Sequence, residues 1–361
     1  DNGNARFVPT KANEEYIAFD EQATVASVEF IETVANQDLH GMATPNMVIL
    51  TPKEYIAYAE EIARLHQEID GMEVAVIDHE TVFNEFSSGT PDATAYRRLM
   101  KMFFDREGGT NGKQLYLLLF GKGLYDNRKI GETGKYVKYP TLLTYQHGTG
   151  TDERASYTTD DYFGFLDDNS GQTIAADKLR VSVGRLPVQS EQEAQNVVNK
   201  LYNYVHNSDK GPWKNQVCVV ADDENYATHM KQAEEICSIL ENSDAHCFIN
   251  KIYIDAYTAE ITSTGRTYPT AKKKLFQVLD DGVLVIDYIG HGSTVAWTHE
   301  NLLNITDIQS MYLKRLPLFI TATCDFGRYD HETTSAGEIL CLNPDGGGIA
   351  LITTTRVVYI S

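Results

Sequence analysis

Cysteine is scarce in this chain of 361 residues, which contains only five: Cys218, Cys237, Cys247, Cys324 and Cys341. Five are too few for a disulfide scaffold, and no two form a C-x-x-C pair, the spacing of many zinc and redox sites. Because the number is odd, at least one thiol remains free. The sequence therefore allows a chemically active cysteine, and it does not fix the redox compartment.

The chain also has few positively charged residues and no long apolar run. Lys and Arg number 31 against 51 Asp and Glu, so the net charge is −20, which opposes binding to nucleic acid or an anionic bilayer. No apolar run approaches the roughly 20 residues of a membrane-spanning helix. The chain begins at Asp1 without a basic and apolar leader, so we expect a processed or excised piece of something longer.

What the chain does contain is an alternation of short apolar strands with helical patterns, which is typical of parallel sheets covered by helices. Its composition, 42% hydrophobic and 23% charged, is that of a globular protein. The predicted strands are 47–50, 74–77, 115–120, 217–221, 248–254, 283–288, 318–322 and 348–353. The predicted helices are 53–66, 92–104, 190–204, 226–240, 270–279, 308–313 and 335–340, the third opened by a Ser190–Glu193 capping box.

The length exceeds what one core usually fills, so these patterns predict two adjoining α/β sub-domains. We place a lead-in segment at 1–44, a first sub-domain at 45–210 and a second at 211–361, which we expect to be truncated at its C-terminus. Strands as apolar as 283–286 and 318–320 look buried on both faces. In such sheets ligands bind outside the carboxyl ends of the strands.

Two strand ends in the second half carry chemically useful residues. One reads Asp287-Tyr-Ile-Gly-His291-Gly-Ser293, and the other reads Thr321-Ala-Thr-Cys324-Asp-Phe-Gly327. If the two strands are neighbours, a thiol and an imidazole leave the same edge of the sheet, which is the minimum for nucleophilic catalysis. The N–H groups of Gly292 and Cys324 could then stabilise a tetrahedral oxyanion.

Less specific interpretations compete with this one. A single cysteine at the end of a buried strand is more often a small core residue than a nucleophile. A zinc site built from His291, His299, Cys324 and His331 is a further alternative, but no pair of them has a familiar ligand spacing. The pairing of a cysteine and a glycine-flanked histidine on two strand ends is what favours catalysis.

Several longer stretches carry a resemblance to a known family. Gly282–Trp297, Leu316–Cys324 and Gly348–Ile352 resemble the catalytic block of the gingipains, which are caspase-fold cysteine peptidases. Other motifs resemble one branch of that family, the PorU proteins, which are sortase-like signal peptidases of the type IX secretion system. These motifs are Asn36–Gly41, Phe83–Asp92, Phe120–Asp126, Thr159–Gly164 and Val183–Pro187, so the resemblance covers nearly the whole chain.

The resemblance implies a caspase-like α/β fold with a non-catalytic first sub-domain and a catalytic second one. It implies Cys324 and His291 as the catalytic dyad, and the amides of Gly292 and Cys324 as the oxyanion hole. An orienting acid follows the first strand of the catalytic half in gingipains, and Asp223 or Glu224 stands in that place. The alternative is that these acids only cap the next helix or are solvated.

Metal binding and specificity are less defined by the pattern. No cofactor is required for the chemistry, but gingipains bind calcium, and Asp160, Asp161, Asp167 and Asp168 are candidate ligands although they lack EF-hand spacing. Tyr226 stands near the position at which arginine-specific gingipains have an acid, which argues against trypsin-like specificity. Lys122 occupies a position at which the family pattern suggests an acid.

The resemblance also implies a substrate and a location. PorU proteins remove C-terminal sorting domains from type IX secreted proteins through a thioester and attach the cargo to anionic lipopolysaccharide. The expected partners are exported proteins bearing a sorting domain, lipopolysaccharide as acceptor and an outer-membrane carrier, but no nucleic acid. The expected location is the extracellular side of a bacterial outer membrane, reached by a signal peptide absent from this chain. A secreted degradative gingipain-like endopeptidase and an inactive caspase-fold binding module are the alternatives.

Overall fold

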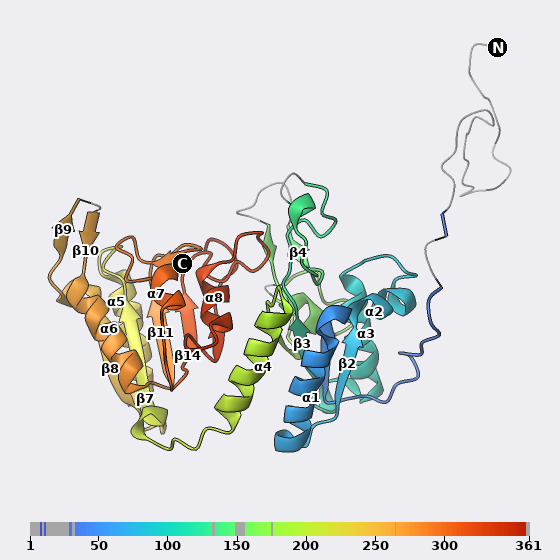
Figure 1. Cartoon of the computed structure of the whole chain (residues 1–361), viewed down its shortest axis with the longest axis horizontal. Helices are drawn as coiled ribbons and strands as arrows, with labels where there is room; N and C mark the ends of the chain where they lie inside the picture. The colour runs from blue at the N-terminus through green and yellow to red at the C-terminus, as the bar shows by residue number, and fades with distance from the viewer. Residues whose placement is uncertain are drawn as a thin grey trace, which may run out of the picture. The chain divides into compact units, whose positions relative to one another are not determined.

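The structure is a computed structural model, and it describes residues 8, 11, 29–30, 33–131, 134–148, 156–174, 176–263 and 265–358. Residues 39–361 belong to one compact unit, and residues 1–38 belong to a separate one. Within the larger unit the chain forms two parallel sheets, each carrying helices on its faces (Figure 1). The predicted α/β class, with parallel sheets flanked by helices, is confirmed.

The first sheet is formed by the N-terminal half of the compact unit. It has four parallel strands in the order β2 (Val74–Asp78), β1 (Met47–Thr51), β3 (Tyr116–Phe120) and β6 (Ser182–Leu186). One face packs on α1 (Ile56–Asp70) and α4 (Glu191–Val205), and the other packs on α3 (Thr94–Arg106) next to α2 (His79–Phe86). Successive residues of β1 pack alternately into these two cores, because successive side chains of a strand point to opposite faces.

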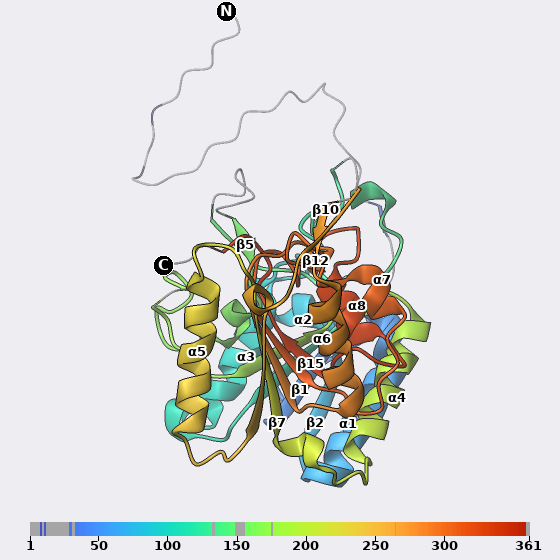
Figure 2. The same cartoon turned by 90° about the vertical axis from the view of Figure 1, so that its left-hand side faces the viewer.

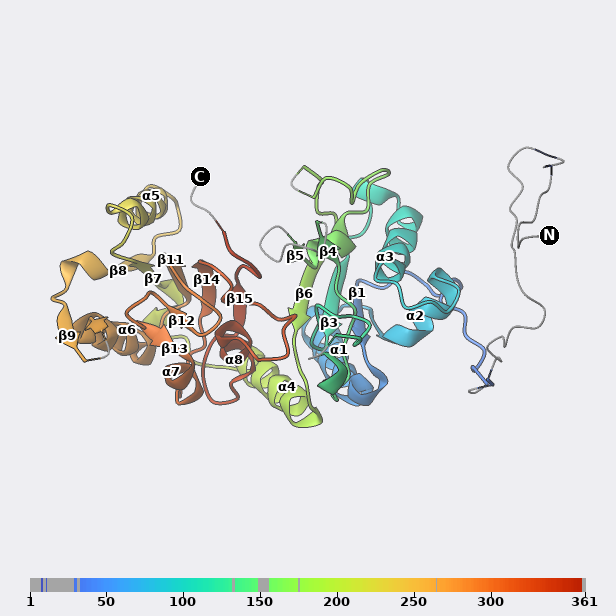
Figure 3. The same cartoon turned by 90° about the horizontal axis from the view of Figure 1, so that it is seen from above.

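The second sheet carries the two strand ends that the sequence singled out. Its five parallel strands run in the order β15 (Ala350–Ile352), β14 (Leu318–Ala322), β11 (Val285–Ile289), β7 (Gln216–Ala221) and β8 (Phe248–Tyr253). Helix α5 (Thr228–Glu241) covers one face, and α6 (Pro269–Asp281), α7 (Ile305–Gln309) and α8 (Ala336–Leu342) lie on the other, as Figures 2 and 3 show.

Short elements complete the described part of the chain. Antiparallel pairs join β4 (Gln146–His147) to β5 (Tyr157–Thr158), β9 (Glu260–Thr262) to β10 (Gly265–Thr267) and β12 (Ala296–Trp297) to β13 (Leu303–Asn304). Single 3-10 turns span Lys53–Tyr55, Gly109–Asn111, Gly134–Tyr136, Asp161–Gly164, Pro212–Asn215 and Ile254–Ala256. Among the described residues, no helix combines the length and the apolar character that crossing a membrane requires.

Some predicted elements differ from the observed ones. Helix α2 was not predicted from the sequence, and neither was β6, in which Gly184 and Arg185 interrupt the apolar pattern of a strand. Helix α5 begins at Thr228 rather than at 226, because residues 225–227 have positive φ and are not part of a right-handed helix. The helix expected at 308–313 spans Ile305–Gln309, where an Asn304–Asp307 capping box fixes its start.

Candidate active site

The register of the second sheet brings three strand ends to one edge. Ile289 of β11 pairs with Ala221 of β7 on one side and with Ala322 of β14 on the other. Asp222 follows β7 directly, while His291 and Cys324 each lie two residues beyond the end of their strand. The prediction that the strands carrying His291 and Cys324 are neighbours is therefore confirmed.

The backbone of His291 is held by several hydrogen bonds. Its N–H donates to Asp222 Oδ2 over 2.9 Å, and its carbonyl accepts from the N–H of Thr298 over 2.8 Å and from the Tyr288 hydroxyl. Gly290 leaves no room for a side chain, since a Cβ there would lie 2.4 Å from Asp222 Cβ. These contacts fix the direction in which the histidine leaves the sheet.

The histidine loop touches the cysteine loop directly. A Cβ on Gly292 would lie 2.3 Å from Thr323 Oγ1, so the residues adjoining His291 and Cys324 are in close contact. This packing explains why glycine follows the histidine. It also places the two candidate catalytic residues on facing loops, although no hydrogen bond joins their side chains among the described residues.

The thiol of Cys324 contacts the segment that follows β15. Cys324 Sγ lies 3.5 Å from both the carbonyl oxygen and the amide nitrogen of Val358, and the cysteine is half-buried. The same segment is tied to the cysteine loop by the Asp325 N–H, which donates to the Arg356 carbonyl over 3.2 Å. Asp325 has a φ of 55°, a left-handed conformation directly after the candidate nucleophile.

The imidazole of His291 has four polar or aromatic neighbours. Its Nε2 lies 2.8 Å from Asn225 Nδ2 and 3.5 Å from Glu224 Oε2. The ring of His299 stacks on it at a centroid distance of 5.3 Å, and the ring of His229 meets it edge-on at 5.4 Å. Nδ1 is therefore the ring nitrogen that these polar neighbours leave for Cys324.

Of the two acids that the sequence left open, Glu224 lies at the imidazole. Its other carboxylate oxygen, Oε1, bonds His299 Nδ1 over 3.0 Å, which lowers the pKa of Glu224 and raises that of His299. Asp223 instead accepts a hydrogen bond from Tyr268 and pairs with Arg266 at 3.2 Å. The geometry favours Glu224 as the orienting acid, and the role itself stays a prediction.

Asp222 is a residue of the site to which the sequence reasoning gave no role. Its carboxylate accepts the backbone N–H groups of His291 and Asp223, each over 2.9 Å, and it is only 1% exposed. Burial raises its pKa to about 7, despite those two hydrogen bonds. The three consecutive acids after β7 indicate a site at this strand end, but the sequence does not show which of the three side chains points into the protein.

The other predicted site residues lie as follows. Gly292 forms an isolated antiparallel bridge with Trp297, and its role in an oxyanion hole, like that of the Cys324 amide, stays a prediction. Three of the four proposed calcium ligands face cations: Asp160 pairs with Arg185, Asp167 with Arg180 and Asp168 with Lys101. Burial and Asp160 raise the pKa of the fourth, Asp161. Calcium binding there also stays a prediction.

Comparison with known proteins shows the family of this chain. The model of Peptidase family C25 matches residues 41–361, and the chain belongs to that family. Peptidase family C25 is the family of the gingipains, and the cysteine endopeptidase activity of this chain stays a prediction. A comparison with curated protein sequences gave no significant match.

Solved gingipain structures show the same fold. The Arg-specific cysteine proteinase gingipain R (RgpB) matches 90% of this chain with a TM-score of 0.63 and 17% identity, and the complex of Porphyromonas gingivalis RgpB pro- and mature domains matches 87% with 0.62 and 17%. Dimeric latent PorU from the same organism is 39% identical over 50% of this chain, with a TM-score of 0.45. The matches span 66%, 64% and 17% of those chains.

Proposed function

We propose that this chain cleaves peptide bonds through a thioester on Cys324, with His291 as the proton-transfer residue. The observation that carries the proposal is the register of β11 and β14, which sets both residues two positions beyond paired strand ends. The contact between Gly292 and Thr323 holds the two loops together. A nucleophile and a base on facing loops are the arrangement that acyl transfer requires.

The reaction follows from these positions. The Cys324 thiol loses its proton to Nδ1 of His291, and the thiolate attacks the scissile carbonyl carbon to form a tetrahedral oxyanion. The backbone N–H groups of Gly292 and Cys324 are the proposed donors to that oxygen. The C–N bond then breaks as His291 protonates the departing amine, leaving a thioester. Water or an amine attacks the thioester and regenerates the thiol.

A cleft beside the cysteine offers a place for the substrate. It has a volume of about 590 Å³ and is lined by β6 of the first sheet, β15 of the second and the segment after β15, including Arg185, Thr355 and Val358. Val358 also contacts Cys324 Sγ, so the cleft adjoins the nucleophile, although neither catalytic side chain lines it. A polypeptide lying in this cleft reaches Cys324 where the Val358 backbone now lies.

The finer function is sortase-like. The motifs shared with the PorU branch support removal of C-terminal sorting domains from type IX secreted proteins, and transfer of the cargo to anionic lipopolysaccharide on the extracellular side of an outer membrane. An outer-membrane carrier is the further proposed partner. The side chain of His291 is 34% exposed, so an acceptor amine can approach its ring from solvent.

The first test is a covalent one. Exposure to a peptidyl acyloxymethyl ketone should add one inhibitor mass to the intact chain, and Cys324→Ala should abolish the adduct while His291→Ala slows its formation. Cys247→Ala is the matched control, since Cys247 is also partly buried but lies away from the site. An unmodified folded chain that gives no adduct would favour the inactive binding module.

A second test separates transfer from degradation. A cargo protein with a C-terminal sorting domain and the same cargo without it are offered together with a primary amine. Cleavage of the first alone, with the amine joined to the new carboxyl end, supports the sortase-like function. Equal turnover of both and of ordinary denatured proteins would instead support the degradative endopeptidase.

The orienting acid can be tested by a matched pair of variants. We expect Glu224→Gln to lower kcat/KM by about 10-fold or more, part of the about 10²- to 10⁴-fold that acid–base catalysis contributes. Asp223→Asn should have the smaller effect on kcat/KM and the larger effect on Tm, because it removes the charge of one of the two carboxylates that pair with Arg266 and weakens the acceptor of the Tyr268 hydroxyl. The reverse order would assign the role to Asp223.

A further inference from the structure

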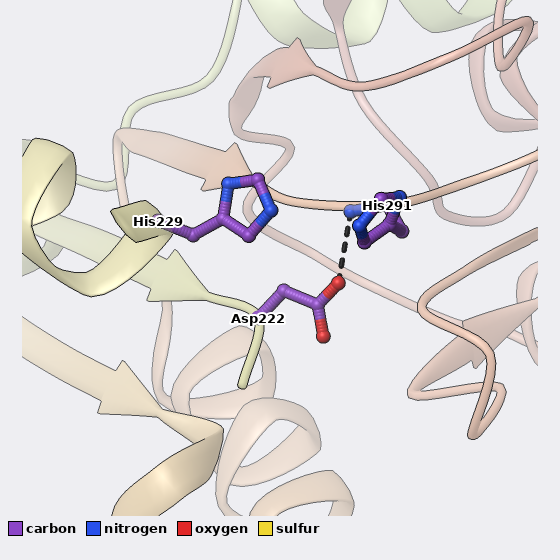
Figure 4. A group of neighbouring side chains, drawn as sticks. All are labelled: Asp222, His229 and His291. Carbon is purple, nitrogen blue, oxygen red and sulfur yellow. Dashed lines mark hydrogen bonds between the residues drawn. The ribbon is translucent and has the colours of Figure 1, made fainter. Parts of the chain in front are cut away.

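Three potential metal ligands meet beside the candidate active site. Asp222, His229 and His291 each offer a ligand atom, and these atoms all lie within 4.8 Å of one another. Figure 4 shows the three side chains, which come from the end of β7, the first turn of α5 and the loop after β11. Asp222 and His229 are buried, and the ring of His291 is partly open to solvent.

The two histidines direct the same ring nitrogen to one point. Asn225 Nδ2 lies 3.0 Å from His229 Nε2 and 2.8 Å from His291 Nε2. An amide nitrogen can only donate hydrogen bonds, so in this arrangement both Nε2 atoms present lone pairs to it. A ring nitrogen that presents its lone pair is able to bind a metal.

The carboxylate of the cluster has no cation of its own. Among the described residues Asp222 forms no ion pair with Lys or Arg, and the negative charges of Asp223 and Glu300 raise its pKa. A neighbouring cluster of Asp222, Asp223 and Glu300 is different, because Arg266 lies 3.2 Å from Asp223 and 2.6 Å from Glu300. Arg266 already pairs with acids of that second cluster. The cluster that contains the two histidines has no such cation among the described residues, so it is the one at which a metal ion would bind.

The ligand types favour zinc over calcium or magnesium. Two imidazole nitrogens and one carboxylate suit zinc, whereas calcium and magnesium prefer oxygen ligands alone. Glu224, whose Oε2 lies 3.5 Å from His291 Nε2, is placed to supply a fourth ligand or to hold a water molecule. Zinc bonds of about 2.0 Å require the ligand atoms to draw closer than 4.8 Å, and rotation of the half-exposed His291 ring allows it.

We propose that Asp222, His229 and His291 form a zinc site that switches the candidate active site off. Zinc displaces the Asn225 amide and binds both Nε2 atoms, so the remaining hydrogen of the His291 ring lies on Nδ1. Without zinc the ring hydrogen can also lie on Nε2, which faces Glu224 Oε2 at 3.5 Å, and Nδ1 is then free to accept the Cys324 proton. Zinc on Nε2 excludes that tautomer, so the ring cannot accept the proton. The inhibitory consequence rests on the proposed function, whereas the site itself does not.

Calorimetry on the full chain tests the site without relying on activity. Zinc chloride is titrated into the Cys324→Ala variant, in which the thiol cannot act as a ligand, and one equivalent should bind. Adding His229→Phe, which keeps a ring at the position, should weaken binding by more than the about 10- to 100-fold that loss of an outer-shell partner causes. His66→Phe is the matched control, since His66 forms an exposed pair with Asp70 on α1.

A spectroscopic measurement identifies the zinc ligands directly, so the test does not depend on a His229 variant that folds. Zinc X-ray absorption of the loaded Cys324→Ala chain should show two imidazole ligands. Absence of bound zinc, a spectrum without imidazole scattering, or an affinity for zinc in folded His229→Phe and His229→Ala variants equal to that of the parent Cys324→Ala chain would overturn the site. Zinc should also inhibit the unmodified peptidase reversibly. An active chain that binds no zinc contradicts this inference alone, while a zinc-binding chain without peptidase activity contradicts the proposed function alone.

Discussion

At the scale of single residues, Asp287 is an ionisable group buried in the middle of β11. It is 7% exposed, its Oδ2 has no hydrogen-bond partner among the described residues, and burial raises its pKa from 3.8 to about 6. Because the folded-state pKa lies above the unfolded one, folding is favoured at low pH. The stability contributed by this group is complete below about pH 4 and is lost as the pH rises through 6.

Replacing Asp287 by asparagine should therefore stabilise the protein only above pH 4. A rise of the pKa from 3.8 to about 6 corresponds to about 3 kcal/mol of unfolding free energy at pH 8. Denaturant unfolding at pH 4 and pH 8 measures the difference, and Asp280→Asn, at an exposed position of α6, is the control. An equal effect of Asp287→Asn at both pH values would contradict the raised pKa.

At the scale of elements, a buried ion pair joins the loop after β3 to α8. Lys122 Nζ lies 2.8 Å from Glu338 Oε1, and the two side chains are 0% and 2% exposed. The second oxygen of Glu338 accepts the Ser335 N–H in the capping box that opens α8. The lysine found where the family pattern suggests an acid thus fastens the first sheet to a helix of the second.

Breaking this pair from one side should be costly. Lys122→Met leaves the Glu338 carboxylate buried without its cation, and we expect a loss of about 3–5 kcal/mol of unfolding free energy. The double variant Lys122→Met with Glu338→Gln removes both charges and should recover most of the loss. Denaturant unfolding of the four proteins gives the coupling energy, and additive losses would show that the pair does not act as a unit.

At the scale of the whole molecule, the net charge of −20 and the acids around the site should influence which substrates approach quickly. We expect kcat/KM for a lysine-rich peptide to fall as the salt concentration rises from 0.05 to about 0.5 M, where the Debye length becomes short. A glutamate-rich peptide of the same length should show the opposite slope. Salt-independent rates for both would mean that the field at the cleft is not negative.

The sequence by itself determined the class of fold and the sheet edge at which His291 and Cys324 lie. Runs such as 283–288 and 318–322 are too apolar for an exposed strand, and parallel strands present their carboxyl ends at one edge, so His291 and Cys324 could be placed together. It could not show β6, because Gly184 and Arg185 break the pattern of a strand at the sheet edge.

Only the tertiary structure decided which acid turns toward which partner. Asp222, Asp223 and Glu224 are adjacent in sequence, yet the first holds the His291 backbone, the second bonds Tyr268 and the third lies at the imidazole. The left-handed turn at 225–227 and the start of α5 at Thr228 bring His229 beside them. Local sequence sets strands and loops, but side-chain direction in a loop is set by contacts between residues distant in the chain.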